Sequence, residues 1–263
     1  MKLDDAYANI PHIPGGEDYP PTWEAAAEEF RAALQDAGRL RAGISYGPGP
    51  RQALDLLLPD GPANGICLFV HGGYWLKFHR HFWSHFAAGP LARGWAVAIP
   101  SYDLCPDVRI ADITAQIARA TRCAAAQLDG PMVLAGHSAG GHLVGRMCVP
   151  GQLPANVLAR VQHVMPISPL ADLRPLLQTS MNEQFRLDEA TAIAESPALM
   201  QPAPVPVTVW VGGEERPAFL DQARWLAEAW GCDHVVAAGK HHLNVIDGLA
   251  DPDSAMVKTL LNI

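Results

Sequence analysis

A serine between glycines is the residue of this sequence whose surroundings most clearly indicate chemistry. Residues 136–140 read GHSAG; they follow the apolar run 131–135, and a helical pattern occupies 139–149. In such a strand–turn–helix the serine lies on a strained turn with its hydroxyl projecting, while the glycines let strand and helix cross closely. The positive end of the helix dipole lies beneath that hydroxyl. This context predicts that Ser138 is a nucleophile, although the pentapeptide alone would be weak evidence.

A second chemical signal is the pair of glycines in residues 71–75 (HGGYW), directly after an apolar strand pattern. Glycines let the backbone approach a substrate carbonyl oxygen, and each amide aimed at the developing oxyanion is worth about 2.7–4 kcal/mol. In α/β-hydrolases, loops of this HGG type supply those amides. Comparison with them predicts the N–H groups of Gly73 and Tyr74 as donors, joined by that of Ala139. His71 is expected to organise the loop rather than to react.

The acid that such a serine requires is expected after the strand pattern 205–211, because α/β-hydrolases order their triad as serine, acid and histidine along the chain. Residues 212–217 (GGEERP) follow that strand and offer Glu214 and Glu215, but no aspartate. A carboxylate there would fix the tautomer of a neighbouring histidine and stabilise its protonated form. The loop by itself leaves both glutamates open.

The base is expected after the last strand, where residues 240–244 read KHHLN. A neutral imidazole in this place would take the proton of the serine hydroxyl. Of the 11 histidines in the chain, only His241 and His242 fall in this loop. We favour His242 as the base and keep His241 as the alternative.

The elements that must position these residues follow from the apolar pattern. Apolar runs typical of buried strands occupy residues 53–58, 65–70, 95–99, 131–135, 161–167, 205–211 and 232–237. Helical spacing occupies residues 110–128, 139–149, 217–230, 243–249 and 253–261. This alternation predicts an α/β fold of the α/β-hydrolase type, with a mostly parallel central sheet and helices on both faces.

The domain organisation is expected to be simple, since no flexible linker, composition shift or internal repeat divides the chain. We predict one domain over residues 1–263. An N-terminal helical extension reaches to about residue 45 and contains a helix over 23–37 with Thr22 as its cap. Residues 169–204 carry several prolines and weaker periodicity, and we expect a small cap-like insertion near the strand ends, which could move as a lid.

Composition excludes several classes of protein. With 49% hydrophobic and 17% charged residues the 263-residue chain is globular rather than disordered. Its net charge of −8 argues against nucleic acid as the main partner, and we find no polybasic run for a membrane surface. The apolar runs are far shorter than the ~18 residues that span a bilayer. The acidic first residues argue against a secretory signal, and five scattered cysteines indicate reduced thiols, so we expect a cytoplasmic protein.

Metal chemistry is not expected. His81 and His85 are four residues apart, and His79 lies close by, but no HExxH glutamate accompanies them. We interpret these histidines as the rim of a pocket or the surface of a helix. No metal and no organic cofactor is predicted.

Aromatic residues follow the HGG loop closely. They could pack in the core or form an aromatic pocket beside the site, and the sequence leaves both interpretations open. These residues are Tyr74, Trp75, Phe78, Phe82 and Trp83.

Taken together, the HGGYW loop at 71–75 and the segment GHSAGGHL at 136–143 resemble kynurenine formamidases (arylformamidases), which belong to the esterase and lipase branch of the α/β-hydrolases. Further similar segments are YGP at 46–48, YDLCP at 102–106, SPLADLRPL at 168–176 and LDEA at 187–190. The resemblance covers roughly residues 20 to 250. It implies the α/β-hydrolase fold and a serine hydrolase that needs no cofactor.

Carried over residue by residue, the resemblance implies Ser138 as the nucleophile, His242 as the base and Glu215 as the acid. The family usually has an aspartate where this chain has Glu215, and Glu214 therefore remains a competitor. The family also usually has an aspartate immediately before the base, where this chain has His241.

The reaction implied by the resemblance is hydrolysis of an aryl formamide, with N-formylkynurenine converted to kynurenine and formate through a formyl-enzyme. The expected substrate pocket comprises Gly72, Trp75 and Phe82. The substrate carboxylate calls for a guanidinium, for which Arg186 and Arg174 are candidates. A small-molecule substrate is thus the expected partner, and a homo-oligomer is compatible with the sequence.

Two other functions are weighed against this one. A carboxylesterase acting on small acyl esters would use every one of the same catalytic residues. A non-catalytic ligand-binding protein with this fold would not need an intact serine, acid and histidine, and the presence of all three argues against it.

Overall fold

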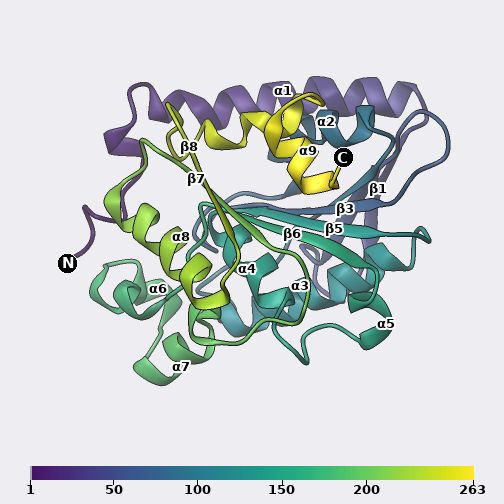
Figure 1. Cartoon of the computed structure of the whole chain (residues 1–263). Helices are drawn as coiled ribbons and strands as arrows, with labels where there is room; N and C mark the ends of the chain where they lie inside the picture. Colours follow the sequence, from purple (N-terminus) through teal and green to yellow (C-terminus); the bar gives the residue numbers. More distant parts are fainter. Residues whose placement is uncertain (1) are drawn as a thin grey trace.

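The computed structural model describes residues 2–263, and its centre is an eight-stranded sheet in the order β1-β2-β4-β3-β5-β6-β7-β8 (Figure 1). The strands are β1 (Leu40–Ser45), β2 (Ala53–Leu57), β3 (Ile66–Val70), β4 (Ala96–Pro100), β5 (Met132–His137), β6 (Val161–Ile167), β7 (Thr208–Gly212) and β8 (Asp233–Ala237). The six strands from β4 to β8 in this order run parallel, whereas β2 pairs antiparallel with β4 and β1 antiparallel with β2. The mostly parallel sheet that the apolar runs predict is confirmed.

Burial on both faces explains why the central strands read as continuous apolar runs. Every residue of β3, β4 and β5 is buried. Successive side chains of a strand point to opposite faces, so Leu68 packs in one hydrophobic cluster while Cys67 and Phe69 pack in another. Each cluster is covered by its own set of helices.

One face of the sheet is covered by α1 (Tyr19–Asp36), the 3-10 helix η3 (Arg80–Ala87), α2 (Ala88–Ala92) and α9 (Ala255–Leu261). The other face is covered by α3 (Ile110–Ala125), α4 (Ala139–Met147) and α8 (Pro217–Trp230). Figure 1 shows the two layers above and below the sheet. Helices on both faces are what the sequence predicts.

The segment predicted as an insertion lies between β6 and β7. It contains η4 (Arg174–Gln178), α6 (Asn182–Phe185), α7 (Glu189–Ala194) and η5 (Pro197–Leu199). The remaining short helices are η1 (Ile10–His12), η2 (Gly16–Asp18), α5 (Ala155–Leu158) and η6 (Val245–Ala250). In Figure 1, α6 and α7 lie beside α8, at the end of the molecule where β7 leads into α8.

Two elements differ from the sequence patterns. Strand β1 is not indicated by the apolar pattern because it is an edge strand whose residues are all at least partly exposed and whose Gly43 has φ +70°. The helix predicted over 243–249 is the 3-10 helix η6. Both elements are stabilised by tertiary contacts rather than by local periodicity.

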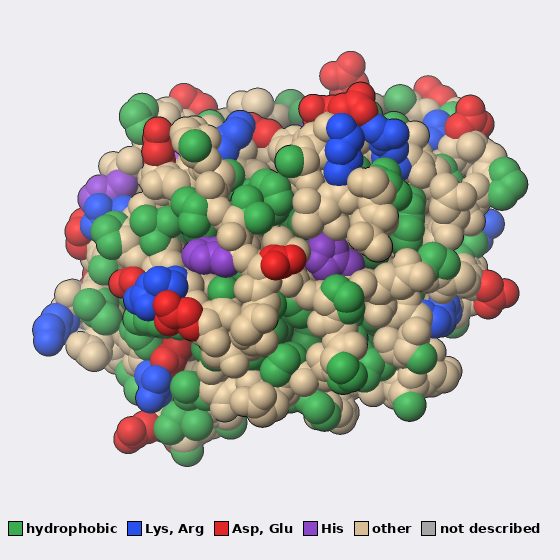
Figure 2. Space-filling model, in the orientation of Figure 1, with side chains coloured by type: hydrophobic (Ala, Val, Ile, Leu, Met, Phe, Trp, Pro, Cys, Tyr) green, Lys and Arg blue, Asp and Glu red, His purple; other side chains and the backbone are tan. Residues whose placement is uncertain are grey.

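Within residues 2–263, no helix combines the length and the apolar character that a bilayer crossing requires. On the face drawn in Figure 2, Lys and Arg side chains are dispersed among Asp and Glu.

Candidate active site

The turn that carries Ser138 joins β5 to α4. Ser138 has φ +56° and ψ −116°, which is a strained conformation for a residue other than glycine. A Cβ added at Gly136 would lie 2.2 Å from Gly140 O, and one added at Gly140 would lie 1.9 Å from Val70 O. Only glycine therefore allows strand and helix to cross this closely, and the crossing leaves the serine at the tip of the turn.

The loops after β7 and β8 bring one of the two glutamates to one of the two histidines. His242 Nδ1 lies 2.6 Å from Glu215 Oε2, and both side chains are buried. The other oxygen of the carboxylate, Oε1, accepts hydrogen bonds from Gly212 N at 2.8 Å and from Ser168 Oγ at 2.5 Å. Because a carboxylate accepts the Nδ1 proton, the second ring nitrogen of a neutral His242 keeps a free lone pair, as a general base requires.

The alternatives left open by the sequence lie elsewhere. Glu214 is exposed, and its amide donates to Lys240 O at 2.9 Å. His241 Nε2 lies 3.2 Å from Tyr19 Oη, and its Nδ1 accepts from two backbone amides of its own loop. The ring of His241 therefore faces α1, on the other side of the loop from Glu215.

The ring of His242 is held between two others. Phe219 packs at 4.4 Å and His137 at 4.7 Å between ring centroids. His137 Nε2 donates to His242 O at 2.9 Å, so the residue preceding Ser138 ties the histidine loop to the nucleophile turn. Burial, with His242 nearby, lowers the pKa of His137 well below its ordinary value, and this histidine stays neutral. The structure records no hydrogen bond between the Ser138 hydroxyl and the His242 ring; His137 provides the connection between their loops.

The HGG loop approaches the same turn. A Cβ added at Gly72 would lie 3.1 Å from Ser138 Cβ. Within residues 2–263, the amides of Gly73, Tyr74 and Ala139 donate no hydrogen bond to another protein group. Gly73 has φ +107° and Tyr74 has φ +53°, which turns this stretch of backbone out of the ordinary extended form. An oxyanion hole requires such unpaired amides, and these three belong to the HGG loop and to the residue after Ser138.

His71 holds this loop in place. Its ring stacks on Tyr102 at 4.4 Å, its Nδ1 donates to Gly72 O at 2.8 Å, and its carbonyl accepts from Tyr102 Oη at 2.9 Å. Burial lowers the pKa of His71 to about 3. A neutral, fully buried ring engaged in this way organises the loop, in line with the expectation from the sequence.

The predicted substrate-pocket residues have different surroundings. Gly72 lies against the serine. Trp75 is fully buried and packs edge-to-face against His142 at 5.1 Å and against Phe185 at 5.6 Å, so it belongs to the core. Phe82, on η3, packs against Phe78 and His79, and Arg186 is exposed at the end of α6.

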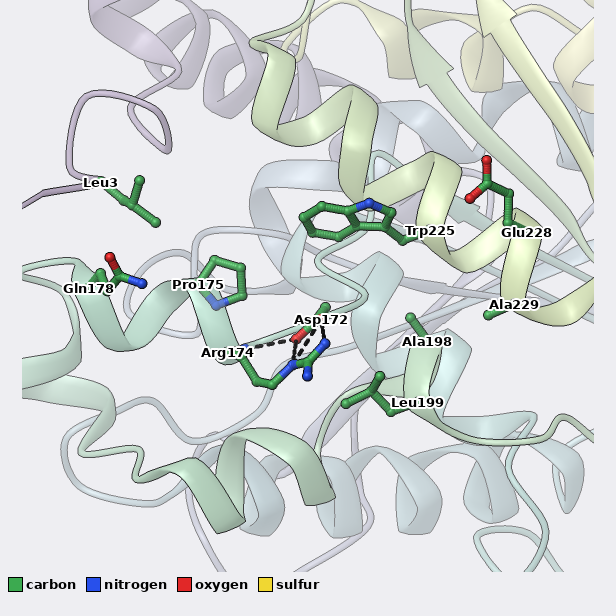
Figure 3. Close-up of a pocket in the computed structure, with 10 residues that line it drawn as sticks. All are labelled: Leu3, Asp172, Arg174, Pro175, Gln178, Ala198, Leu199, Trp225, Glu228 and Ala229. Carbon is green, nitrogen blue, oxygen red and sulfur yellow. Dashed lines mark hydrogen bonds and ion pairs between the residues drawn. The ribbon is translucent and has the colours of Figure 1, made fainter.

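Arg174 lines a hollow of about 790 Å³ that is separate from these residues (Figure 3). Its guanidinium pairs with Asp172 two residues earlier, at 2.6 Å between Nη2 and Oδ2. The hollow lies between η4, η5, α8 and Leu3, with Trp225 on one wall. None of the predicted catalytic or oxyanion residues lines it.

Of the three histidines that could have suggested a metal, His81 lies beside a buried aspartate. His81 Nε2 lies 3.5 Å from Asp55 Oδ2, and the same carboxylate pairs with Arg31 and Arg80. No group of three or more His, Cys, Asp or Glu side chains in the described part of the chain could hold a metal ion.

Sequence reasoning missed the contribution of the first residues. Tyr7 is buried, and its carbonyl accepts from Tyr74 Oη at 2.6 Å. Its hydroxyl accepts from Gln222 Nε2 at 2.9 Å, and Asp5 pairs with Arg216, the residue after Glu215, at 2.7 Å. Because residues 2–9 show no apolar periodicity, no sequence signal could have indicated this contact.

Comparison with known proteins agrees with the fold. The model of a family described as alpha/beta hydrolase fold matches residues 67–205. The kynurenine formamidase of Drosophila melanogaster is 28% identical over 99% of this chain and 96% of its own length. That of Salmo salar is 24% identical over 96% of this chain and 91% of its own length.

Among solved structures, a protein from Silicibacter sp. TM1040 described as a candidate thioesterase is 60% identical, with a TM-score of 0.97 over 99% of both chains. Esterase B of Lactobacillus rhamnosis is 17% identical, with a TM-score of 0.69 over 90% of this chain and 96% of its own. The latter similarity concerns the fold alone.

Proposed function

This chain belongs to the alpha/beta hydrolase fold family, and we propose that it is a serine hydrolase that cleaves an aryl formamide, with N-formylkynurenine as the substrate. The contact of 2.6 Å between His242 Nδ1 and Glu215 Oε2, on the loops beside Ser138, is the observation that carries the serine-hydrolase mechanism. The substrate is supported by the similarity to kynurenine formamidases, which extends over nearly the whole chain.

In the proposed mechanism His242 Nε2 takes the proton of Ser138, and Oγ attacks the formyl carbon. The oxyanion accepts hydrogen bonds from the amides of Gly73, Tyr74 and Ala139. Protonated His242 then donates to the departing aniline nitrogen, and the C–N bond breaks to leave a formyl ester on Ser138. Water, deprotonated by His242, hydrolyses that ester and releases formate. Glu215 remains ionised and stabilises the imidazolium throughout.

Two acyl-transfer alternatives would use the same residues. Carboxylesterases share the fold, and the 60% identical structure is described as a candidate thioesterase. The leaving groups separate these chemistries, because an aniline must be protonated as it departs, whereas a thiolate is a stable anion. Formamide cleavage therefore depends most on His242 as an acid.

The test is a comparison of kcat/KM for N-formylkynurenine, p-nitrophenyl acetate and acetyl-CoA. We expect the formamide to have the highest value. A preference of several orders of magnitude for the ester or the thioester would overturn the formamidase assignment and retain the hydrolase.

Ser138→Ala is expected to abolish turnover of all three substrates and to leave the unfolding midpoint nearly unchanged, because only one hydroxyl is lost. A fluorophosphonate probe should label the wild-type protein at Ser138. Absence of labelling in the folded protein would favour the non-catalytic ligand-binding alternative.

A further inference from the structure

We propose that Ser168 is a positioning residue whose hydroxyl holds the Glu215 carboxylate in contact with His242. The inference rests on the proposed function, because Ser168 has this role only if Glu215 is the acid. Ser168 acts through Glu215 and touches no reacting atom in the mechanism above.

The place of Ser168 in the fold is tightly defined. It follows the last residue of β6, and its side chain has no exposed surface. Its amide donates to Trp210 O on β7 at 2.7 Å, and its Oγ donates to Glu215 Oε1 at 2.5 Å. Its φ of +47° lies in the left-handed region, which a serine adopts only where the surroundings require it. The fold therefore fixes this hydroxyl between the ends of two neighbouring strands.

A glutamate in this loop needs such a restraint. Its side chain has one more rotatable bond than aspartate and so more conformers to exclude. The two oxygens are divided between partners, with Oε2 facing His242 and Oε1 accepting from Ser168 and from Gly212 N. Two donors on Oε1 select the rotamer in which Oε2 meets the imidazole. Both donors are uncharged, which leaves the negative charge of the carboxylate available to the protonated histidine.

A buried serine can also be a merely structural hydrogen-bonding residue, and the chain offers a matched control for that role. Ser196 is likewise fully buried. Its Oγ donates to Ala192 O at 2.7 Å and accepts from Leu173 N at 2.8 Å, and it has no contact with the triad. Ser196→Ala therefore reports what the loss of a buried serine hydroxyl does to folding alone.

The experiment compares Ser168→Ala and Ser168→Gly with Ser196→Ala, using the substrate with the highest kcat/KM. Glycine suits a positive φ, so Ser168→Gly removes the hydroxyl while keeping the backbone conformation favourable. We expect both Ser168 variants to lower kcat roughly tenfold with KM little changed, and Ser196→Ala to keep wild-type kcat. Wild-type kcat in folded Ser168→Gly, checked by thermal unfolding, would overturn the proposal.

A double-mutant cycle with Glu215→Gln completes the test. Glu215→Gln alone should lower kcat strongly, and adding Ser168→Ala should then change it by less than about twofold, because a positioning residue has nothing left to position. Additive losses would overturn the role of Ser168 alone. Wild-type kcat in Glu215→Gln would instead overturn the acid assignment of the proposed function.

Discussion

Two buried carboxylates, at opposite ends of the sheet, have different hydrogen-bond partners. Asp55 lies on β2, the second strand from one edge, and Glu215 follows β7, the second strand from the other. Asp55 accepts from Arg31, from Arg80 Nε at 2.8 Å and from Gly43 N at 2.8 Å. Among residues 2–263, Glu215 has no arginine or lysine partner, and its only ionisable neighbour in hydrogen-bond contact is His242.

The difference shows how a structural carboxylate differs from one suited to catalysis. Two permanently charged guanidiniums neutralise Asp55 and bind α1 and η3 to the sheet. Around Glu215, uncharged donors fix the geometry without neutralising the charge, which in the proposed mechanism stabilises the protonated histidine. Four predictions test this contrast.

Glu215→Gln should have the largest effect. We expect kcat to fall on the order of 10³–10⁴-fold, because the imidazolium loses its counter-charge and the imidazole its preferred tautomer. Unfolding in urea should change little by comparison. Steady-state kinetics on the folded variant measures this change. Equal kcat in Glu215→Gln and wild type would contradict the difference in role between Glu215 and Asp55.

Asp55→Asn should instead affect stability. Breaking a buried ion pair from one side leaves guanidiniums uncompensated, at a cost of about 3–5 kcal/mol in the free energy of unfolding. Turnover per folded molecule should be unchanged. Urea unfolding followed by tryptophan fluorescence measures the loss, and a large fall in kcat with wild-type stability would contradict the structural role.

The pH dependence of stability should distinguish Asp55 from the buried histidines. Burial alone would raise the pKa of Asp55, but the Gly43 amide and the two guanidiniums outweigh it and hold the pKa below the ordinary value. The stabilisation by Asp55 is therefore complete above about pH 4 and is lost as pH falls through its lowered pKa.

His71 and His142 titrate differently, because burial lowers the pKa of each to about 3. Both bind protons near pH 6.5 in the unfolded chain but stay neutral in the folded one, so stability should fall as pH drops from about 6.5 toward 3. Each contributes up to about 1.4 kcal/mol per pH unit in that window. His142→Gln should flatten the pH dependence of urea midpoints between pH 7 and 5. If the slope stayed unchanged, groups other than His142 would be responsible for the pH dependence.

Glu214→Gln should have the smallest effect. The side chain is exposed and makes no contact with His242, so we expect kcat within about twofold of wild type. A loss as large as that of Glu215→Gln, in the same assay, would mean that the acid has been assigned to the wrong neighbour.

The sequence predicts those parts of the site that depend on local chemistry. The glycines around Ser138, the apolar strands and the order of the loops could be read directly, since close crossing and burial constrain residue type at each position. The same reasoning could not choose between Glu214 and Glu215, because that choice depends on which side chain turns inward at a loop. The catalytic roles themselves remain predictions.

Contacts between segments distant in the sequence could not be predicted, because they too depend on the folded structure. Ser168 belongs to a segment that resembles the family, but its role appears only when the ends of β6 and β7 lie side by side. Trp75 could equally line a pocket or fill the core, and only its contacts with His142 and Phe185 place it in the core. The first residues of the chain carry no pattern at all.

Tyr7 has a consequence for protein engineering. Its carbonyl braces the side chain of Tyr74, and its ring packs at 6.0 Å from Phe219, which in turn backs the ring of His242. Residue 7 thus contacts the HGG loop through its backbone and, through its side chain, the ring that packs against the histidine, from a segment with no catalytic motif. Mutant libraries aimed at new acyl preferences should therefore include residues 5–8, which a choice guided by catalytic motifs would omit.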